Sequence, residues 1–582
     1  MSTIVPRNAD VRVIARRVST RISALRLGRL RGIMNRLVPA LVLAVAIAGS
    51  TALSYYFART LYFGGDDWDF LLHRGTVAGV DSGMWAPHYG HWSTGVVLMY
   101  RFLFSVAGLS YLPYIAVCWV LHAAIVVVTY HLVRRSGTGR GVGLTVAWLL
   151  AFIGAGAEAL LWATVMNLLA SLLFGLLAML LYVVAGDGPR TRFAAWLLLI
   201  VALAFSATGI TLAVVLAVFV ALRFSVRAAA ELISVPAVTW VVWWLLIGHE
   251  ESASTVSDRS DYLGVPEFFW TGLSQALGTF AGIPASGGIL LAVLLVLPFV
   301  VRDAPETLRL MAVAGVVGAV FQMLLAAATR VSAGLAWATT GRYAYLTIAL
   351  LMPSMALGLH WLATSVKPSR WVSSGLVVVV LGVYTIGAVG LFRDYAHDQK
   401  PYRTPWKDRL AGLVAAADSG ETVLTDQLDP VLNPYLEADL VLSPEVRGAI
   451  AGTATDQGVL DAEALAMTAV GPRTAWLGSP ATVRLALGFE GAIDPRPGCH
   501  VYTAPDGGTP ALELDTGPGG NEITVQSPAT SIRTQLVRGD VESVPRNWPV
   551  EPDTQIHVAT TARDAVLRVT FDKTGSYVIC RK

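Results

Sequence analysis

Eleven apolar runs fill most of the first 392 residues of this 582-residue chain, and the polar breaks between them are short. A hydrocarbon core of roughly 30 Å is crossed by about 20 apolar residues in a helix. Inside lipid, a helix is the simplest way for one segment to bond all its backbone polar groups. The runs lie at about residues 38–57, 111–133, 141–158, 163–185, 193–208, 209–222, 229–248, 287–301, 309–329, 344–364 and 371–392. The chain is therefore predicted to be a polytopic α-helical membrane protein with about 11 transmembrane helices.

The charged residues separate this membrane part from a water-soluble part. Residues 393–582 hold 42 of the Lys, Arg, Asp and Glu side chains, and the twice-longer segment before them holds 41. Only 14% of all residues are charged, whereas about a quarter is usual in soluble proteins. With three cysteines and no Cys-x-x-Cys pair, the sequence argues against a disulfide scaffold and a zinc site. It also shows no phosphate loop and no nucleic-acid patch, so no nucleic-acid partner is expected.

The positions of the basic residues predict the orientation. Nine arginines precede the first apolar run, and with that end inside, the inner side carries twenty Lys and Arg against six in the outer loops before residue 393. Cytoplasmic loops are the ones enriched in these residues. We expect a multi-pass protein of the inner (plasma) membrane, with a cytoplasmic N-terminus and an extracytoplasmic C-terminal domain. The predicted segments are a basic cytoplasmic segment (1–37), a transmembrane domain (38–392) with long outer loops at 58–110 and 249–286, and the C-terminal domain (393–582).

The C-terminal domain is predicted to have two sections. Residues 393–490 read as mixed α/β, with a helix at 406–417 and short strands at 422–424 and 438–442. Residues 491–582 read as β-rich and sandwich-like, because short alternating segments recur between Gly, Pro and Asp. Strands are expected at 499–503, 511–514, 522–526, 535–537, 555–559, 566–571 and 577–580. The first and last carry Cys499 and Cys580, which an oxidising exterior would allow to bridge.

An acidic pair opens the first outer loop, in the sequence Phe63-Gly64-Gly65-Asp66-Asp67-Trp68. Neighbouring carboxylates raise each other's pKa unless a cation or hydrogen bonds compensate. One of them is then suited to act as a general base toward a hydroxyl, while the other orients it or binds a metal. The alternative is that both aspartates cap an interfacial helix and are merely solvated.

These residues carry a resemblance to a known family. An Asp-Asp pair after the first span, a long outer loop with Tyr89-Gly90-His91-Trp92, many further spans and an outer C-terminal domain resemble the GT-C superfamily of integral membrane glycosyltransferases. The Arg-rich, Ala/Val-rich composition is similar to that of actinobacterial cell-envelope members such as arabinofuranosyltransferases and mannosyltransferases. The chain departs from the Trp-Trp-Asp-x-Gly motif, since Leu245 follows Trp243-Trp244. That departure argues against the oligosaccharyltransferase subgroup.

The resemblance implies transfer of a sugar from a polyprenyl-phosphate donor to a cell-envelope glycan or glycolipid on the outer face, usually with inversion. Asp66 or Asp67 would deprotonate the acceptor hydroxyl, and the two are interchangeable at this level. The leaving phosphate needs a cation, and the outer arginines Arg342 and Arg330 suit it because a guanidinium donates two parallel hydrogen bonds and stays charged. Their alternative role is snorkelling at the interface.

Further candidates follow from the same resemblance. His88 and His91 are predicted to bind the donor phosphate, with simple solvation as the alternative. Trp68, Tyr89, Trp92 and Tyr343 are predicted substrate contacts. In metal-dependent relatives a second outer acidic group helps the first-loop aspartate, so Asp67 and Glu158 are candidate ligands for a divalent cation, Mg, Mn or Ca.

Two other functions compete with the transferase. A lipid-linked glycan transporter or flippase would need a hydrophilic path through the spans, and a non-catalytic envelope-assembly scaffold would need no acidic pair. The apolar runs carry almost no charge at mid-span, where ion-coupled transporters hold their ionisable groups. The sequence therefore favours the transferase.

Overall fold

The structure is a computed structural model. It describes residues 37–251, 256, 259–365, 370–419, 427–429, 433–450, 457–467, 469–473, 482–487, 490–493, 499–504, 511–515, 521–526, 528–543, 545–550, 555–560, 562, 564–573 and 575–580. The chain forms two compact units. Unit 1 is Met1–Arg59, Trp85–Gly95 and Ile115–Ala396, and unit 2 is Thr60–Met84, Val96–Tyr114 and His397–Lys582. The predicted basic segment 1–37 lies outside the described residues except for its last residue.

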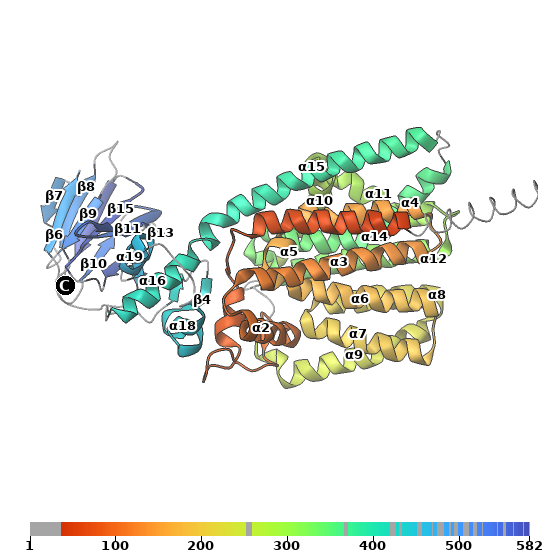
Figure 1. Cartoon of the computed structure of the whole chain (residues 1–582), viewed down its shortest axis with the longest axis horizontal. Coiled ribbons are helices and arrows are strands. Elements are labelled where there is room, and N and C mark those ends of the chain that lie inside the picture. The colour runs from red at the N-terminus through yellow and green to blue at the C-terminus, as the bar shows by residue number, and fades with distance from the viewer. Residues whose placement is uncertain are drawn as a thin grey trace, which may run out of the picture. The chain divides into compact units, whose positions relative to one another are not determined.

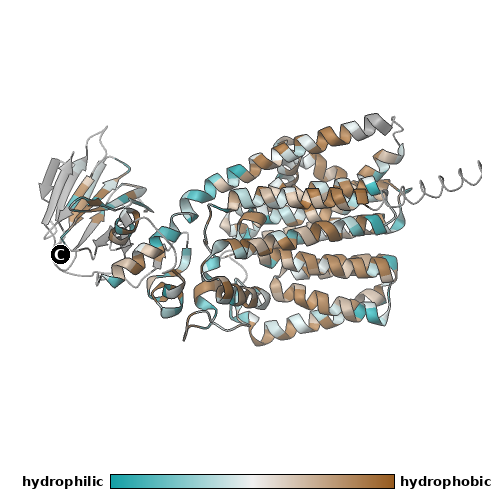
Figure 2. Cartoon of the chain, viewed as in Figure 1, coloured by the Kyte–Doolittle hydropathy of each residue, from teal (hydrophilic) through white to brown (hydrophobic). Residues whose placement is uncertain are grey.

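Unit 1 is a bundle of mostly apolar helices (Figures 1 and 2). After the first helix, Leu37–Ala58, come α3 (Tyr111–Arg135), α4 (Arg140–Ala151), α5 (Ala157–Leu161), α6 (Met166–Ala185), α7 (Pro189–Phe205), α8 (Thr208–Arg223), α9 (Val226–Leu246), α10 (Val265–Ala281), α11 (Gly287–Val300), α12 (Glu306–Arg330), α14 (Gly341–Ser365) and α15 (Arg370–Arg403). Helix α12 packs against α8 and α14, and α6 packs against α7. The last residues of α15 and the first of α3 belong to unit 2.

Helices cover all eleven predicted runs. Within the residues that the structure describes, seven helices are long and apolar enough to cross a membrane, and α4 with α5 makes an eighth if that bent pair is one span. The protein is thus a multi-pass membrane protein, as predicted. The number eleven stays a prediction, because α7, α8 and α11 have 17, 16 and 14 residues.

The third predicted span is broken between α4 and α5. The two halves bend by 41°, and every residue from Phe152 to Leu161 is buried. Glycine is required at this bend, since a Cβ on Gly156 would lie 2.7 Å from the Tyr345 ring of α14. The close approach of α5 to α14 places Glu158 beside the start of α14.

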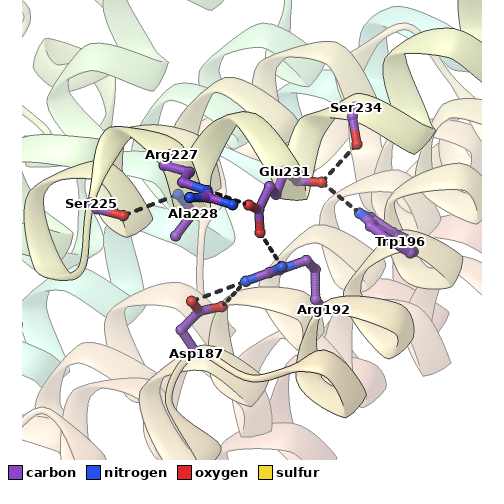
Figure 3. A network of polar contacts seen from close by, with 8 residues as sticks. All are labelled: Asp187, Arg192, Trp196, Ser225, Arg227, Ala228, Glu231 and Ser234. Carbon is purple, nitrogen blue, oxygen red and sulfur yellow. Dashed lines mark hydrogen bonds and ion pairs between the residues drawn. The ribbon is translucent and has the colours of Figure 1, made fainter.

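A network of polar contacts joins α7 to α9 (Figure 3). Arg192 of α7 forms ion pairs with Glu231 of α9 and with Asp187, the second at 3.1 Å. The Arg227 Nε also donates to Glu231 at 2.9 Å, and Ser225 caps α9 by accepting from the Ala228 N–H at 3.1 Å. Arg192 and Arg227 are two of the arginines predicted to face the cytoplasm. Partly exposed ion pairs such as these contribute little to stability.

Unit 2 contains two segments of the first outer loop and the C-terminal domain. The loop supplies a turn of π-helix, η1 (Asp69–His73), and most of α2 (Thr94–Ala107). The C-terminal helices are α16 (Trp406–Asp418), α17 (Ala438–Val441), α18 (Pro444–Ile450) and α19 (Gln457–Met467), and β3 (Gln427–Asp429) pairs with β4 (Asn433–Glu437).

Two antiparallel sheets then form the predicted sandwich-like section. One has the order β5-β14-β10-β16-β8-β7 and the other β12-β11-β15-β9-β6, with β13 also on β11. The strands are β5 (Ala469–Arg473), β6 (Thr482–Leu487), β7 (Glu490–Ile493), β8 (Cys499–Ala504), β9 (Ala511–Asp515), β10 (Asn521–Gln526), β11 (Ser531–Arg538), β12 (Val541–Glu542), β13 (Arg546–Pro549), β14 (Gln555–Thr560), β15 (Val566–Phe571) and β16 (Gly575–Cys580). Their core includes Leu512, Leu536 and Phe571.

The structure confirms most of the predicted elements of this domain. The helix at 406–417 and all seven strands after residue 490 are present. The strand at 438–442 is wrong: this segment is helix α17, in which Ala438 and Val441 are buried at helical spacing. The strand at 422–424 lies outside the described residues. Cys499 is the register partner of Cys580 across β8 and β16, and a disulfide between them stays a prediction.

A buried carboxyl in this domain predicts a pH dependence of stability. Burial raises the pKa of Glu463 on α19 above its usual 4.5, although Arg409 and Arg546 oppose the shift. A carboxyl group whose pKa is higher in the folded protein than in the unfolded chain contributes its full stabilisation below the unfolded pKa. That contribution is lost as the pH rises through the folded pKa. The melting temperature of wild type relative to Glu463→Gln should therefore fall as the pH is raised from below to well above 4.5. A difference that stays constant over this range would contradict the assignment.

Candidate functional site

The acidic loop, residues 60–74, holds the adjacent residues Asp66 and Asp67 in different environments. Gly65 has a φ of +58°, so the chain turns sharply before the pair. Asp67 is 0% exposed, and its Oδ2 accepts from the Gly64 N–H at 3.0 Å. Its Oδ1 accepts from the Tyr100 hydroxyl of α2 at 2.5 Å. Asp66 is half-buried and so retains access to solvent.

Aromatic rings enclose Asp67. Trp68 is 0% exposed and packs on Phe63, whose ring also meets Tyr114 edge-on at 4.9 Å. Tyr100 contacts the Phe70 ring at 5.2 Å. In this dry setting a hydrogen bond to a carboxylate is strong, and losing one is costly. The arrangement therefore fixes Asp67 as a rigid anchor for the loop.

A third carboxylate in the loop is neutralised within it. The Asp69 Oδ2 accepts from Arg74 at 2.9 and 2.8 Å, and both side chains are less than a tenth exposed. Arg101 of α2 in turn donates to the Arg74 carbonyl at 2.5 Å. Asp69 therefore serves the loop's structure, and Asp66 is the more accessible carboxylate of the three.

In unit 1, Arg342 lies in a cluster of aromatic rings at the start of α14. Its guanidinium is 5.3 Å from the Trp162 ring, 5.1 Å from Trp337 and 5.7 Å from Tyr343. Attraction between a guanidinium and ring faces holds the side chain in place without cancelling its charge.

Glu158 completes this cluster. Its Oε2 accepts from the Arg342 backbone N–H at 3.1 Å, and its Oε1 lies 3.4 Å from the Arg342 Nη1. A carboxylate at a helix N-terminus is stabilised by the helix dipole. The contact needs glycine at 341, since a Cβ there would lie 2.9 Å from the Glu158 Cβ. Glu158 thus orients Arg342 in this structure.

The His/Trp segment forms a tight hairpin, β1 (Pro87–His88) and β2 (His91–Trp92). Its two turn residues have positive φ, Tyr89 at +49° and Gly90 at +71°. Left-handed backbone is costly for tyrosine, so other contacts must hold it. The Tyr89 N–H donates to the Glu251 Oε1 at 2.9 Å, and Arg330, 8% exposed, lies 5.9 Å from the Tyr89 ring.

The rest of the hairpin is anchored to α9. Trp92 stacks on Trp243 with ring centroids 5.5 Å apart and planes 11° apart, and the Trp243 indole donates to the Trp85 carbonyl at 2.9 Å. The Trp92 indole donates to Thr94 at 2.8 Å. His88 is buried, and His91 is half-buried. Trp92 is 6% exposed, so its main visible role is packing.

The predicted residues fall into three groups. Asp66, Asp67 and Trp68 lie together in unit 2. In unit 1, Arg342 and Tyr343 lie with Glu158, and the hairpin brings Tyr89 to Arg330. Assembly of these groups into one site stays a prediction.

Three comparisons with known proteins were made. No family model and no curated protein matches the chain. Among solved structures, the chain is similar to ArnT from Cupriavidus metallidurans bound to undecaprenyl phosphate, at 13% identity and a TM-score of 0.42, over 72% of this chain and 88% of that one. It is also similar to the oligosaccharyltransferase of Archaeoglobus fulgidus in complex with Zn and sulfate, at 14% identity and a TM-score of 0.34, over 69% of this chain and 58% of that one.

Sequence reasoning missed the partners of the predicted residues. Tyr100 was one tyrosine among the 18 of the chain, and nothing in its spacing from Asp67 signals the hydrogen bond. Trp162 and Trp337 lie far apart in sequence, and both rings contact Arg342. Glu251 lies in the predicted outer loop 249–286, 162 positions from Tyr89 in sequence. The only available signal was that each lies in or beside a predicted outer loop.

The two residues predicted to bind a divalent cation lie in different units, Asp67 in unit 2 and Glu158 in unit 1. Asp67 already accepts two hydrogen bonds, and Glu158 is engaged by Arg342. The part of the chain that the structure describes contains no group of three or more His, Cys, Asp or Glu suited to a metal. Dependence on a cation stays a prediction.

The Tyr100 hydroxyl predicts a measurable effect. Tyr100→Phe removes the hydroxyl that donates to buried Asp67, so we expect a loss of about 1–3 kcal/mol in stability, seen as a lower melting temperature in detergent. Tyr114→Phe is the matched control, because its buried hydroxyl donates to the Gly108 carbonyl instead. Equal melting temperatures for Tyr100→Phe and wild type would refute the role of this bond.

Proposed function

We propose that the chain is a membrane glycosyltransferase that moves a sugar from a polyprenyl-phosphate donor to a cell-envelope glycan or glycolipid. The observation that carries the proposal is the asymmetric acidic pair directly after the first span. A buried, doubly bonded Asp67 fixes the loop, and the half-buried Asp66 beside it stays accessible. The resemblance of the first-loop motif to GT-C transferases supports the same function.

In the proposed reaction Asp66 is the general base. Its carboxylate takes the proton of the acceptor hydroxyl as that oxygen attacks the anomeric carbon of the donor sugar. The new C–O bond forms as the bond from the anomeric carbon to the phosphate oxygen breaks. The lipid phosphate leaves with the electron pair, and the configuration at the anomeric carbon inverts. Asp67 never transfers a proton and acts by holding the loop.

Arg342 is proposed to bind the donor phosphate. The negative charge on that group grows as the sugar leaves, and a pre-oriented guanidinium stabilises it more in the transition state than in the ground state. The three rings and Glu158 supply that orientation. Arg330, His88 and His91 are proposed to assist at the phosphate, and Tyr89, Trp92, Tyr343 and Trp68 to shape the sugar and lipid sites.

The finer assignments are part of the proposal. They comprise arabinofuranosyl or another pentosyl or hexosyl transfer, an actinobacterial envelope acceptor, and a reaction on the outer face of the inner membrane. The composition, the motif and the distribution of basic residues support them.

Reconstitution into liposomes separates the transferase from its rivals. Purified protein should glycosylate an acceptor from at least one polyprenyl-phosphate sugar, in a panel run with and without EDTA. A transporter would move the lipid-linked sugar across the bilayer without transfer, and a scaffold would do neither. Lipid translocation without any transfer product across the panel would overturn the proposal, and loss of transfer in EDTA would establish cation dependence.

A further inference from the structure

The C-terminal part of the chain contacts the acidic loop directly, within unit 2. Arg403, at the end of α15, is 4% exposed. Its Nε donates to the Tyr62 carbonyl at 2.7 Å, and its Nη2 donates to the Tyr111 hydroxyl at 2.6 Å. The guanidinium also lies 5.1 Å from the Tyr111 ring. A buried charge with such partners is fixed in one position.

The same arginine passes close to the glycines that precede the aspartates. A Cβ on Gly64 would lie 3.1 Å from the Arg403 Cγ, so the side chain fits tightly where residue 64 has none. The neighbouring Thr404 hydroxyl donates to the Thr60 carbonyl at 2.6 Å. The start of the loop is thus bonded to the end of α15.

A second C-terminal element holds the next residues of the loop. Asn433 of β4 is 2% exposed, and its Oδ1 accepts from the Gly65 N–H at 2.8 Å. His73 at the far end of η1 bonds the Tyr435 carbonyl at 3.1 Å. Arg403 and Asn433 therefore bind the loop at Tyr62 and Gly65. These two residues flank Gly64, whose N–H donates to Asp67.

We propose that Arg403 and Asn433 are positioning residues for the acidic pair, so that the C-terminal domain is required to build the catalytic loop. The inference rests on the proposed function, in which Asp66 is the base. Gly64 and Gly65 are flexible by nature, and a displacement of about 1 Å at a reacting group can cost about a hundredfold in rate. The side chains of Arg403 and Asn433 remove that freedom by bonding the Tyr62 carbonyl and the Gly65 N–H.

The test compares Asn433→Ala, Arg403→Lys and the matched control Tyr402→Ala in the full-length protein in detergent. Tyr402 precedes Arg403 on α15 and is 52% exposed. We expect Asn433→Ala to lower kcat about ten- to a hundredfold with little change in the KM for donor. Amide hydrogen exchange in the peptide containing Gly64 and Gly65 should speed up in the same variant. Arg403→Lys should lower kcat and speed up the exchange to a smaller extent. Tyr402→Ala should change neither kcat nor the exchange rate.

Further outcomes separate a failure of this inference from a failure of the proposed function on which it rests. Asn433→Asp retains an acceptor for the Gly65 N–H and should restore slow exchange, which a variant that simply unfolds would not do. Faster exchange with wild-type kcat in Asn433→Ala would overturn positioning while leaving the transferase intact. Absence of any transfer product from the wild-type protein across the donor panel would instead overturn the proposed function, whatever the exchange rates.

Discussion

Replacing Asp66 by asparagine is expected to lower kcat for sugar transfer by about 10²–10⁴, the usual contribution of a general base. Asparagine keeps the size of the side chain and its half-buried position but cannot take the acceptor proton. The melting temperature of the variant tells a loss of chemistry apart from a loss of fold. The measurement is steady-state transfer by purified protein in detergent, with thermal melting of the same preparation.

Asp67→Asn is the matched variant, and it should behave differently. The asparagine amide cannot accept from both the Gly64 N–H and the Tyr100 hydroxyl as the carboxylate does. We expect a loss of stability of about 1–3 kcal/mol and a smaller fall in kcat than for Asp66→Asn. If Asp67→Asn abolished transfer while Asp66→Asn kept it, the assignment of roles within the pair would be reversed.

Arg342→Ala is expected to lower kcat/KM for the donor by about 10²–10³, the effect of removing one preorganised donor from a developing charge. The aromatic rings that hold the guanidinium would remain, so the loss would report on charge at the phosphate. Arg342→Lys should recover only part of the activity, since an ammonium cannot donate as a planar fork. The measurement is the dependence of rate on donor concentration.

Two controls make the Arg342 prediction specific. Arg259→Ala removes an exposed arginine of the same predicted side, and it should leave kcat/KM unchanged. Glu158→Gln keeps a hydrogen-bond acceptor for the Arg342 N–H but removes the ion pair, so it should change the KM for donor more than kcat. Equal activity in Arg342→Ala and Arg259→Ala would exclude Arg342 from the donor site.

The sequence predicted the membrane helices well because length and apolarity alone decide where such helices form. Each of the eleven runs became helix, and even the uncertain boundary near Thr208 is a real turn between α7 and α8. Residue propensities predicted the secondary structure of the C-terminal domain less accurately. Residues 438–442 carry apolar residues that suit a strand, yet their packing at i and i+3 made them helix α17. The short strands β12 and β13 give no alternation long enough to recognise.

The candidate site was predictable in its charged residues and not in their partners. A carboxylate pair or an outer arginine stands out against an apolar sequence, so Asp66, Asp67 and Arg342 were found. Their partners are common residues brought in by tertiary packing, such as Tyr100 on α2 or Trp337 beside α14. The different burial of Asp66 and Asp67 follows from the Gly64–Gly65 turn and from Tyr100, and adjacency in sequence gives no hint of it. Asn433 lies 368 positions from Gly65, which no local pattern connects.

The most direct test of the central claim follows both products of one reaction. Purified protein would be incubated with a polyprenyl-phosphate donor labelled in the sugar and with an envelope-glycan acceptor, and labelled acceptor and released polyprenyl phosphate would be quantified together. The account predicts that both products appear in equal amounts, with inverted configuration at the anomeric carbon, and that both vanish in Asp66→Asn. Bound donor that yields neither product across the panel of sugars would contradict it.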